Sequence, residues 1–292
     1  MHRHRSAVAV TMGILAVLLI AAGAWSAGVP RTAIPLGDGH RSTTTPAIGS
    51  ILTCQANFNG GGASSPGPWL DEQAGTWNLE EKIAVLGNVN FDGSHTITTK
   101  KKKDIRVLKG NGLPLLPAGT FPIANTDPAY QYDHNPNSIQ SVSVSYSVPL
   151  NPKRATTPTC LNMGPIGVLS DGVVLFNALD AQGRDAGAWE VLDAAWGHPE
   201  RTGQYHHHTV PENLAPTTGS AHSGLVGYAL DGFGIYGPLG TGGEVLANAD
   251  LDACHGHTHR ITWDGRSKSL YHYHATMEYP YTLGCYAGTP AN

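Results

Sequence analysis

An internal duplication is the sequence feature that most constrains how this chain folds. Three blocks of residues occur twice in the same order, with almost no change in their spacing. The two copies cover about 164–209 and 224–276, and the second copy carries a seven-residue insertion around RITWDGRSK (260–268). The matching blocks are IGVLSDGVVLFNA (166–178) with VGYALDGFGIYGP (226–238), LDAAWGH (192–198) with LDACHGH (251–257), and QYHHHT (204–209) with LYHYHAT (270–276).

Both copies end on histidines at alternate positions. Successive side chains of a strand point to opposite faces, so two histidines that are two residues apart share one face. Each copy adds a third histidine, five residues after an aligned aspartate. The resulting sets are His198, His206 and His208 in the first copy, and His257, His272 and His274 in the second.

The composition favours strands and loops over long helices. The chain has 292 residues, of which 36 are glycine and 20 are proline, and its apolar runs are short, as in GVVLF and GFGIY. We therefore expect a mainly β fold, an internally duplicated antiparallel β domain with long loops and few short helices. The charged fraction of 14% and the net charge of −4 argue against nucleic acid as a partner.

The N-terminal region indicates export. Residues 1–27 combine a basic start, a long apolar run and small residues, which predicts a signal peptide or an N-terminal membrane anchor. Residues 28–50 are rich in Thr, Pro and Gly and predict a disordered linker. We therefore expect the domain to span residues 51–292 and to be secreted or extracytoplasmic. If the N-terminal segment is not cleaved, it would anchor the protein in the membrane.

Four cysteines in an exported chain favour disulfides. Cys254 and Cys285 align with Ala195 and Gly219, so the first copy lacks both partners together. This favours a bond between Cys254 and Cys285, which leaves Cys54 to pair with Cys160. The alternative is that all four are free, buried thiols.

The sequence also resembles a known family. The string YHYHATMEYPYTLGCYAG (271–288), with DGFGIYGP, LDACHGHTH and MGPIGV before it, is similar to the YHYH family of exported bacterial proteins. NGLP, GTFP and NPNSIQ resemble the N-terminal part of that family, so the resemblance covers roughly Ile51 to Gly288. The first copy departs from the motif, because it reads YHHH. The resemblance implies a grouping and no activity.

The histidines carry the chemistry that we expect. Three imidazoles per copy match the ligand set of a metal site that keeps one open position, and with the cysteines oxidised the donors suit a divalent transition metal, zinc or copper, ahead of iron or nickel. The alternative is that the imidazoles only satisfy buried polar contacts. His255 and His259 are candidate auxiliary ligands or solvent-facing residues. We expect the two sets to converge on one centre, although the duplication also permits two separate sites.

Aspartates recur beside these histidines. Asp193 and Asp252 could each bind the metal, accept a hydrogen bond that orients an imidazole, or cap a turn, and capping is the simplest role. Asp171 and Asp231, each followed by glycine, predict hairpin turns.

Three classes of function fit these patterns. We expect first an exported or cell-surface, histidine-rich metal-binding protein. The first alternative is a metalloenzyme, either a copper oxidoreductase or a zinc-dependent hydrolase. The second is a structural or adhesion module that uses the repeat as a scaffold. No catalytic triad order, nucleotide-binding loop or His-Glu-x-x-His motif is present to assign catalytic residues.

Overall fold

The computed structural model describes residues 29–91, 94 and 96–291. The predicted signal peptide or anchor over 1–27 lies outside these residues. In the described part of the chain, no helix has both the length and the apolar character needed to cross a membrane.

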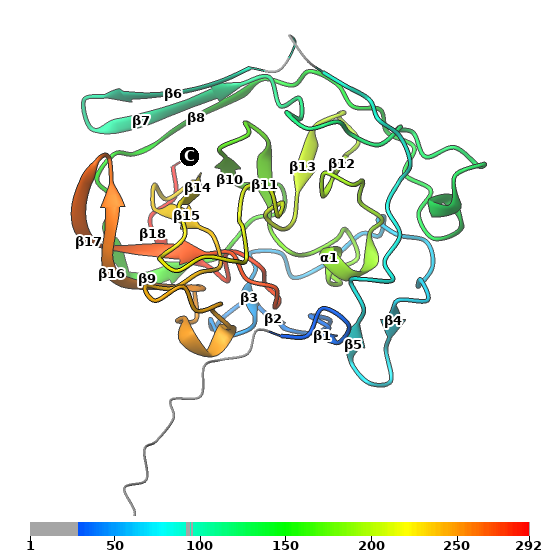
Figure 1. The fold of residues 1–292 in the computed structure, drawn as a ribbon, viewed down its shortest axis with the longest axis horizontal. Coiled ribbons are helices and arrows are strands. Elements are labelled where there is room, and N and C mark those ends of the chain that lie inside the picture. Colours follow the sequence, from blue (N-terminus) through cyan, green and yellow to red (C-terminus); the bar gives the residue numbers. More distant parts are fainter. Residues whose placement is uncertain (1–28, 92–93, 95, 292) are drawn as a thin grey trace, which may run out of the picture.

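An eight-stranded sheet built from both copies of the repeat forms the centre of the molecule (Figure 1). The first copy contributes one half and the second copy the other, and the strand order in the two halves is mirrored. In sheet order, β12-β13-β11-β10-β14-β15-β17-β16, the strands are Gly197–Pro199, Tyr205–His207, Val174–Phe176, Pro165–Leu169, Leu225–Ala229, Gly234–Tyr236, Arg266–His274 and Gly256–Trp263.

The two copies meet where β10 pairs with β14 in antiparallel fashion, with Val168 opposite Tyr228. Two glycines flank this pair at equivalent positions of the repeat. A Cβ atom on Gly167 would lie 2.9 Å from the Tyr228 carbonyl oxygen, and one on Gly227 would lie 2.7 Å from the Val168 carbonyl oxygen. Glycine at both positions therefore lets the two central strands approach each other closely.

In each copy the chain runs from the central strand, β10 or β14, toward the edge of the sheet in the same order. A hairpin joins β10 to β11 and β14 to β15, with Asp171-Gly172 and Asp231-Gly232 at the turns, as predicted. A long loop then returns the chain so that the histidine-bearing strand, β13 or β17, pairs in parallel with β11 or β15. The fold is mainly β and duplicated as predicted, but the central sheet is mixed instead of purely antiparallel.

The insertion in the second copy lengthens one hairpin. β16 and β17 pair over eight residue pairs up to a turn at Asp264-Gly265, whereas β12 and β13 pair over three. The longer hairpin reaches a neighbouring sheet, where the Arg106 guanidinium lies over the rings of Tyr228 and Trp263 and donates to both oxygens of Asp264 at 3.0 Å.

Smaller sheets surround the central one. A three-stranded sheet (β6-β7-β8) contributes Leu108, Val144 and Val148 to the same buried core as the central strands. Among the described residues, two short helical turns and one short helix lie in the loops. The remaining bounds are β1 Ile34–Pro35, β2 Arg41–Ser42, β3 Ile51–Leu52, β4 Leu70–Asp71, β5 Thr76–Trp77, β6 Ile97–Lys102, β7 Ile105–Gly110, η1 Pro128–Gln131, β8 Val144–Pro149, β9 Arg154–Thr159, α1 Ala186–Trp189, η2 Asn248–Asp250 and β18 Tyr286–Gly288.

The expectation of a disordered linker over 28–50 is wrong for residues 29–50. Ile34 is fully buried and pairs with Trp77 between β1 and β5. Asp38 accepts hydrogen bonds from the Asp185 backbone N–H and from the Trp189 indole N–H, both at 2.8 Å. These partners lie about 150 residues further along the chain, so a local reading of composition gave no sign of them.

Both disulfides follow the pairing expected from the duplication. Cys254 is bonded to Cys285, and Cys54 to Cys160. The first bond joins the loop that leads into β16 to the segment that leads into β18. The second joins the segment after β3 to the end of β9, so the N-terminal region is covalently attached to the rest of the domain.

Replacing Asp38 tests whether the N-terminal segment is part of the folded domain. Asp38→Ala removes the acceptor for two buried or partly buried N–H groups, and we expect it to lower the free energy of unfolding by about 2 kcal/mol. Chemical denaturation measures the effect. Glu72→Ala, in an exposed turn, is the matched control and should change stability by no more than about 0.5 kcal/mol. Equal stability of the two variants would contradict the assignment.

Candidate metal centres

The structure gathers the six predicted histidines into two clusters. They lie near the two ends of the central sheet, one at β12 and β13 and the other at β16 and β17, strands that Figure 1 shows. The histidine-bearing strands β13 and β17 are separated by β11, β10, β14 and β15. At about 4.8 Å per strand step, these five steps place the clusters on the order of 24 Å apart. The expected convergence on one centre is therefore wrong, because the copies join edge to edge through β10 and β14 instead of packing face to face.

The first cluster is buried and compact. His198 on β12 lies opposite His206 on β13, and His208 follows β13 on the same face as His206. The His208 Nε2 atom lies 3.1 Å from Nε2 of His206 and 3.4 Å from Nε2 of His198. Two nitrogen ligands of a tetrahedral zinc ion are about 3.3 Å apart, given Zn–N bonds of about 2.0–2.1 Å, so the spacing suits coordination.

The opposite ring nitrogens fix the tautomers of two of these imidazoles. His206 Nδ1 lies 3.2 Å from the Gln204 carbonyl oxygen, and His208 Nδ1 lies 2.6 Å from the Asn177 carbonyl oxygen. A carbonyl oxygen can only accept, so each Nδ1 carries the proton, and each neutral ring presents a lone pair at Nε2. Two Nε2 lone pairs that face each other at 3.1 Å repel unless a cation lies between them.

The second cluster repeats these contacts at the aligned positions. His272 Nδ1 donates to the Leu270 carbonyl at 2.9 Å, and His274 Nδ1 donates to the Gly237 carbonyl at 2.6 Å. The His257 Nε2 atom lies 3.0 Å from Nε2 of His274. The backbone therefore orients the imidazoles in the same way in both copies.

The second cluster is larger than the sequence predicted. His222, in the loop before β14, and His259, on β16, join the three expected histidines. The Nε2 atoms of His222 and His272 are 3.2 Å apart, and His222 Nδ1 donates to the Ser223 carbonyl. His222 was missed because the aligned residue of the first copy is Asn162. His255 is no part of the cluster, because it is buried and bonded to the Thr276 hydroxyl.

Burial favours the neutral form of five imidazoles in the two clusters. It lowers the pKa of His198 to about 4, of His257 to about 4 and of His272 to about 3, and the nearby histidines contribute to the lowering. Burial likewise places the pKa values of His206 and His274 well below the usual range. Neutral imidazole is the form that binds a metal ion.

Asp193 and Asp252 act as turn caps that position the third histidine of each set. The Asp193 carboxylate accepts from the backbone N–H groups of Ala195 and Gly197 and from the Tyr205 hydroxyl. Asp252 accepts from Cys254, Gly256 and Tyr271 in the same way. The capped turns lead directly into His198 and His257, and neither carboxylate belongs to a cluster.

On the face opposite the clusters, side chains of the histidine-bearing strands β13 and β17 contact aspartates. His207 Nδ1 donates to the Trp196 carbonyl and its Nε2 lies 3.2 Å from Asp171. Burial opposes protonation, but the Asp171 carboxylate outweighs it and raises the pKa of His207. In the second copy the Tyr273 hydroxyl donates to Asp231 at 2.5 Å. The hairpin-turn aspartates, Asp171 and Asp231, therefore contact the side chains on the other face of the histidine-bearing strands.

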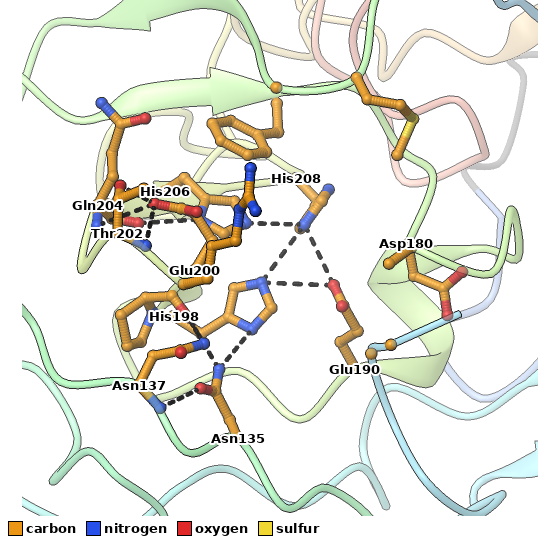
Figure 2. A pocket seen from close by; sticks show the side chains of 18 of the residues that line it. Asn135, Asn137, Asp180, Glu190, His198, Glu200, Thr202, Gln204, His206 and His208 are labelled. Atoms are coloured by element: carbon orange, nitrogen blue, oxygen red, sulfur yellow. Dashed lines mark hydrogen bonds and ion pairs between the residues drawn. The ribbon is translucent and has the colours of Figure 1, made fainter. Parts of the chain in front are cut away.

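The first cluster lies on the wall of a pocket of about 730 Å³ (Figure 2). The Glu190 carboxylate, just after α1, lines the same pocket and its Oε2 atom lies 3.3 Å from Nε2 of His198 and 3.2 Å from Nε2 of His208. This oxygen is buried and accepts no hydrogen bond. Glu190 was missed because no residue of the second cluster corresponds to it, so the duplication gave no signal.

The fold and these clusters define a class of protein: a duplicated β-sheet domain with one histidine cluster in each copy. Residues 145–244, about a third of the chain, match the family described as YHYH protein, as the resemblance in the sequence predicted. The match includes the first copy and the beginning of the second. It ends before the tetrapeptide at 271–274. Searches of curated proteins and of solved structures gave no match.

Replacing Asp193 tests its role as a buried cap. Asp193→Ala leaves the Gly119, Ala195 and Gly197 N–H groups and the Tyr205 hydroxyl without their acceptor, so we expect a loss of about 3 kcal/mol in the free energy of unfolding. Glu81→Ala, at an exposed position, is the control. Chemical denaturation measures the free energy of unfolding of both variants. A loss below about 1 kcal/mol in Asp193→Ala would refute the capping role.

Proposed function

We propose that the protein is an extracytoplasmic metal-binding protein that holds two separate divalent transition-metal ions, zinc or copper. The observation that carries this proposal is the repeated convergence of imidazole Nε2 atoms whose Nδ1 protons are bonded to backbone carbonyls. The arrangement occurs twice, at aligned positions of a duplicated fold, and both times in a buried setting. A set of imidazoles that only satisfied polar contacts would use both ring nitrogens in hydrogen bonds to the protein.

The ligands of each ion follow from the two clusters. His198, His206 and His208 would hold one ion, and His257, His272 and His274, with His222 and His259, would hold the other. Nitrogen donors in sets of three to five favour zinc or copper, because thiolates are tied up in the two disulfides. The backbone carbonyls bonded to Nδ1 orient the rings and increase their basicity.

A metalloenzyme is the second candidate, and one observation favours it. The first cluster borders a pocket of about 730 Å³ and has a buried carboxylate, Glu190, beside two of its Nε2 atoms. Pockets of this size are typical of small-molecule sites.

Removal of the alternate histidines tests the two-site proposal. The mature protein, purified without an affinity tag and loaded with zinc or copper, should contain about two equivalents by elemental analysis. His206→Ala/His208→Ala and His257→Ala/His272→Ala/His274→Ala should each lose about one equivalent, because the altered cluster keeps at most two imidazoles while the other cluster is intact. His40→Ala, an exposed histidine outside both clusters, should lose none.

Two results would count against this proposal. Metal content that stays the same in both alanine variants would refute the ligand assignment and favour a scaffold role for the repeat. Loss of nearly all the metal from each alanine variant would show that the clusters are not independent.

Localisation outside the cytoplasm has its own test. Disulfides persist in oxidising compartments. We therefore expect the chain expressed in a bacterial host with its N-terminal segment to be exported, with no free thiol and with Cys54–Cys160 and Cys254–Cys285 peptides in non-reducing maps. A chain that starts at Gly28 and stays in the cytoplasm is the control and should contain reduced cysteines. Cytoplasmic retention of the full chain would contradict the proposal.

A further inference from the structure

The duplication allows the two clusters to be compared position by position. Their shared core is three histidines, but the residues around that core differ. Pro165 and Leu225 occupy equivalent register positions, opposite Phe176 and Tyr236, so Asn162 is the counterpart of His222. His198 and His257 are likewise equivalent, each opposite a histidine of the next strand, so Glu200 is the counterpart of His259.

In the second copy these two positions close the cluster. The His222 ring lies 4.7 Å from the His259 ring, centroid to centroid, and the His259 ring lies 4.3 Å from that of His257 and 4.6 Å from that of His272. The Nε2 atom of His259 is buried without a hydrogen-bond partner and belongs to the converging set. Five imidazoles therefore surround one point.

In the first copy the same two positions leave the cluster open. Asn162 is exposed, and its carbonyl oxygen accepts a hydrogen bond from Asn177. The Glu200 carboxylate is turned back on its own loop, where it accepts from the backbone N–H groups of Thr202 at 2.9 Å and Gln204 at 3.3 Å. Glu200, the counterpart of His259, lines the pocket beside the first cluster, as does Met163, the residue after Asn162 (Figure 2).

The lining of the pocket indicates what it would accept. Asn135, Asn137, Thr202 and Gln204 supply amide and hydroxyl groups, and Phe176, stacked on His206, supplies an apolar wall. Four carboxylates line the pocket, those of Asp133, Asp180, Glu190 and Glu200. Asp180 is ion-paired with Arg184, and the other three still outnumber the one guanidinium of the lining, that of Arg201. A multiply charged anion would be repelled, whereas a small neutral or singly charged molecule with hydrogen-bonding groups would fit.

We propose that the first cluster holds its ion with an open coordination position facing the pocket, where a small, neutral or singly charged molecule binds the ion through an oxygen or nitrogen donor. The second cluster encloses its ion and has no such position. Three protein ligands with an open position are typical of reactive metal sites, and closed sets are typical of structural ones. This inference rests on the proposed two-site metal binding and assigns different roles to the two ions.

Azide is a suitable probe, because it is small, singly charged and adds an absorption band when it binds Cu(II). Two alanine variants, each loaded with Cu(II), isolate one cluster at a time. His257→Ala/His272→Ala/His274→Ala, which keeps the first cluster, should give an azide-dependent band and a changed electron paramagnetic resonance spectrum. His206→Ala/His208→Ala, which keeps the second, should require at least tenfold more azide. Inorganic phosphate at the same concentration should perturb neither.

Exchanging the surrounding residues provides matched variants, each made in the alanine-variant background that keeps only the cluster under test. Asn162→His/Glu200→His should close the first cluster, so that copper stays bound and the azide response falls at least tenfold. His222→Asn/His259→Glu should open the second cluster, so that copper stays on the remaining three histidines and an azide response appears.

The outcomes separate the two levels of the proposal. Equal azide responses from the two clusters, or a response from neither, with copper bound to both, would overturn the open-site inference and leave two-site metal binding standing. Absence of bound copper in both alanine variants would overturn the metal proposal itself, and the open site with it.

Discussion

The antiparallel pairing of β10 with β14 is the contact on which the rest of the structure depends. It joins the two copies at Val168 and Tyr228, and the neighbouring glycines, Gly167 and Gly227, let the strands approach within distances that any Cβ atom would prevent. Because the copies meet edge to edge, they form one continuous sheet with their histidine strands near its two ends. This single contact determines that the molecule has two histidine clusters instead of one shared centre.

Buried hydrogen bonds then set the geometry of each cluster. Backbone carbonyls take the Nδ1 protons of the alternate histidines, and capped turns at Asp193 and Asp252 position the third histidine. A buried acceptor or donor is costly to leave unpaired, so these bonds restrict ring orientation more strongly than packing alone would. The remaining ring nitrogens are left to face one another. The repetition of the pattern in both copies is why we attribute it to a ligand-binding role.

The two copies differ in the residues that surround the three shared histidines of each cluster. His222 and His259 enclose the second cluster, whereas their counterparts Asn162 and Glu200 leave the first cluster beside a pocket. The insertion in the second copy lengthens the β16–β17 hairpin, which contacts the β6-β7-β8 sheet through Arg106 and Asp264. The second copy is thus tied more closely to its surroundings, and the first cluster borders a pocket.

The sequence by itself determined the repeat, the mainly β class, both disulfide pairings and the six histidines of the two cores. Each of these follows from a periodicity or an alignment that is local or internal to the chain. Only the tertiary structure decided that the clusters are separate, that His222 and Glu190 lie beside them and that residues 29–50 are ordered. Those features depend on contacts between segments far apart in the chain, such as Asp38 with Trp189. The duplication did not reveal His222 or Glu190 either, because Asn162 replaces His222 in the first copy and no residue of the second cluster corresponds to Glu190.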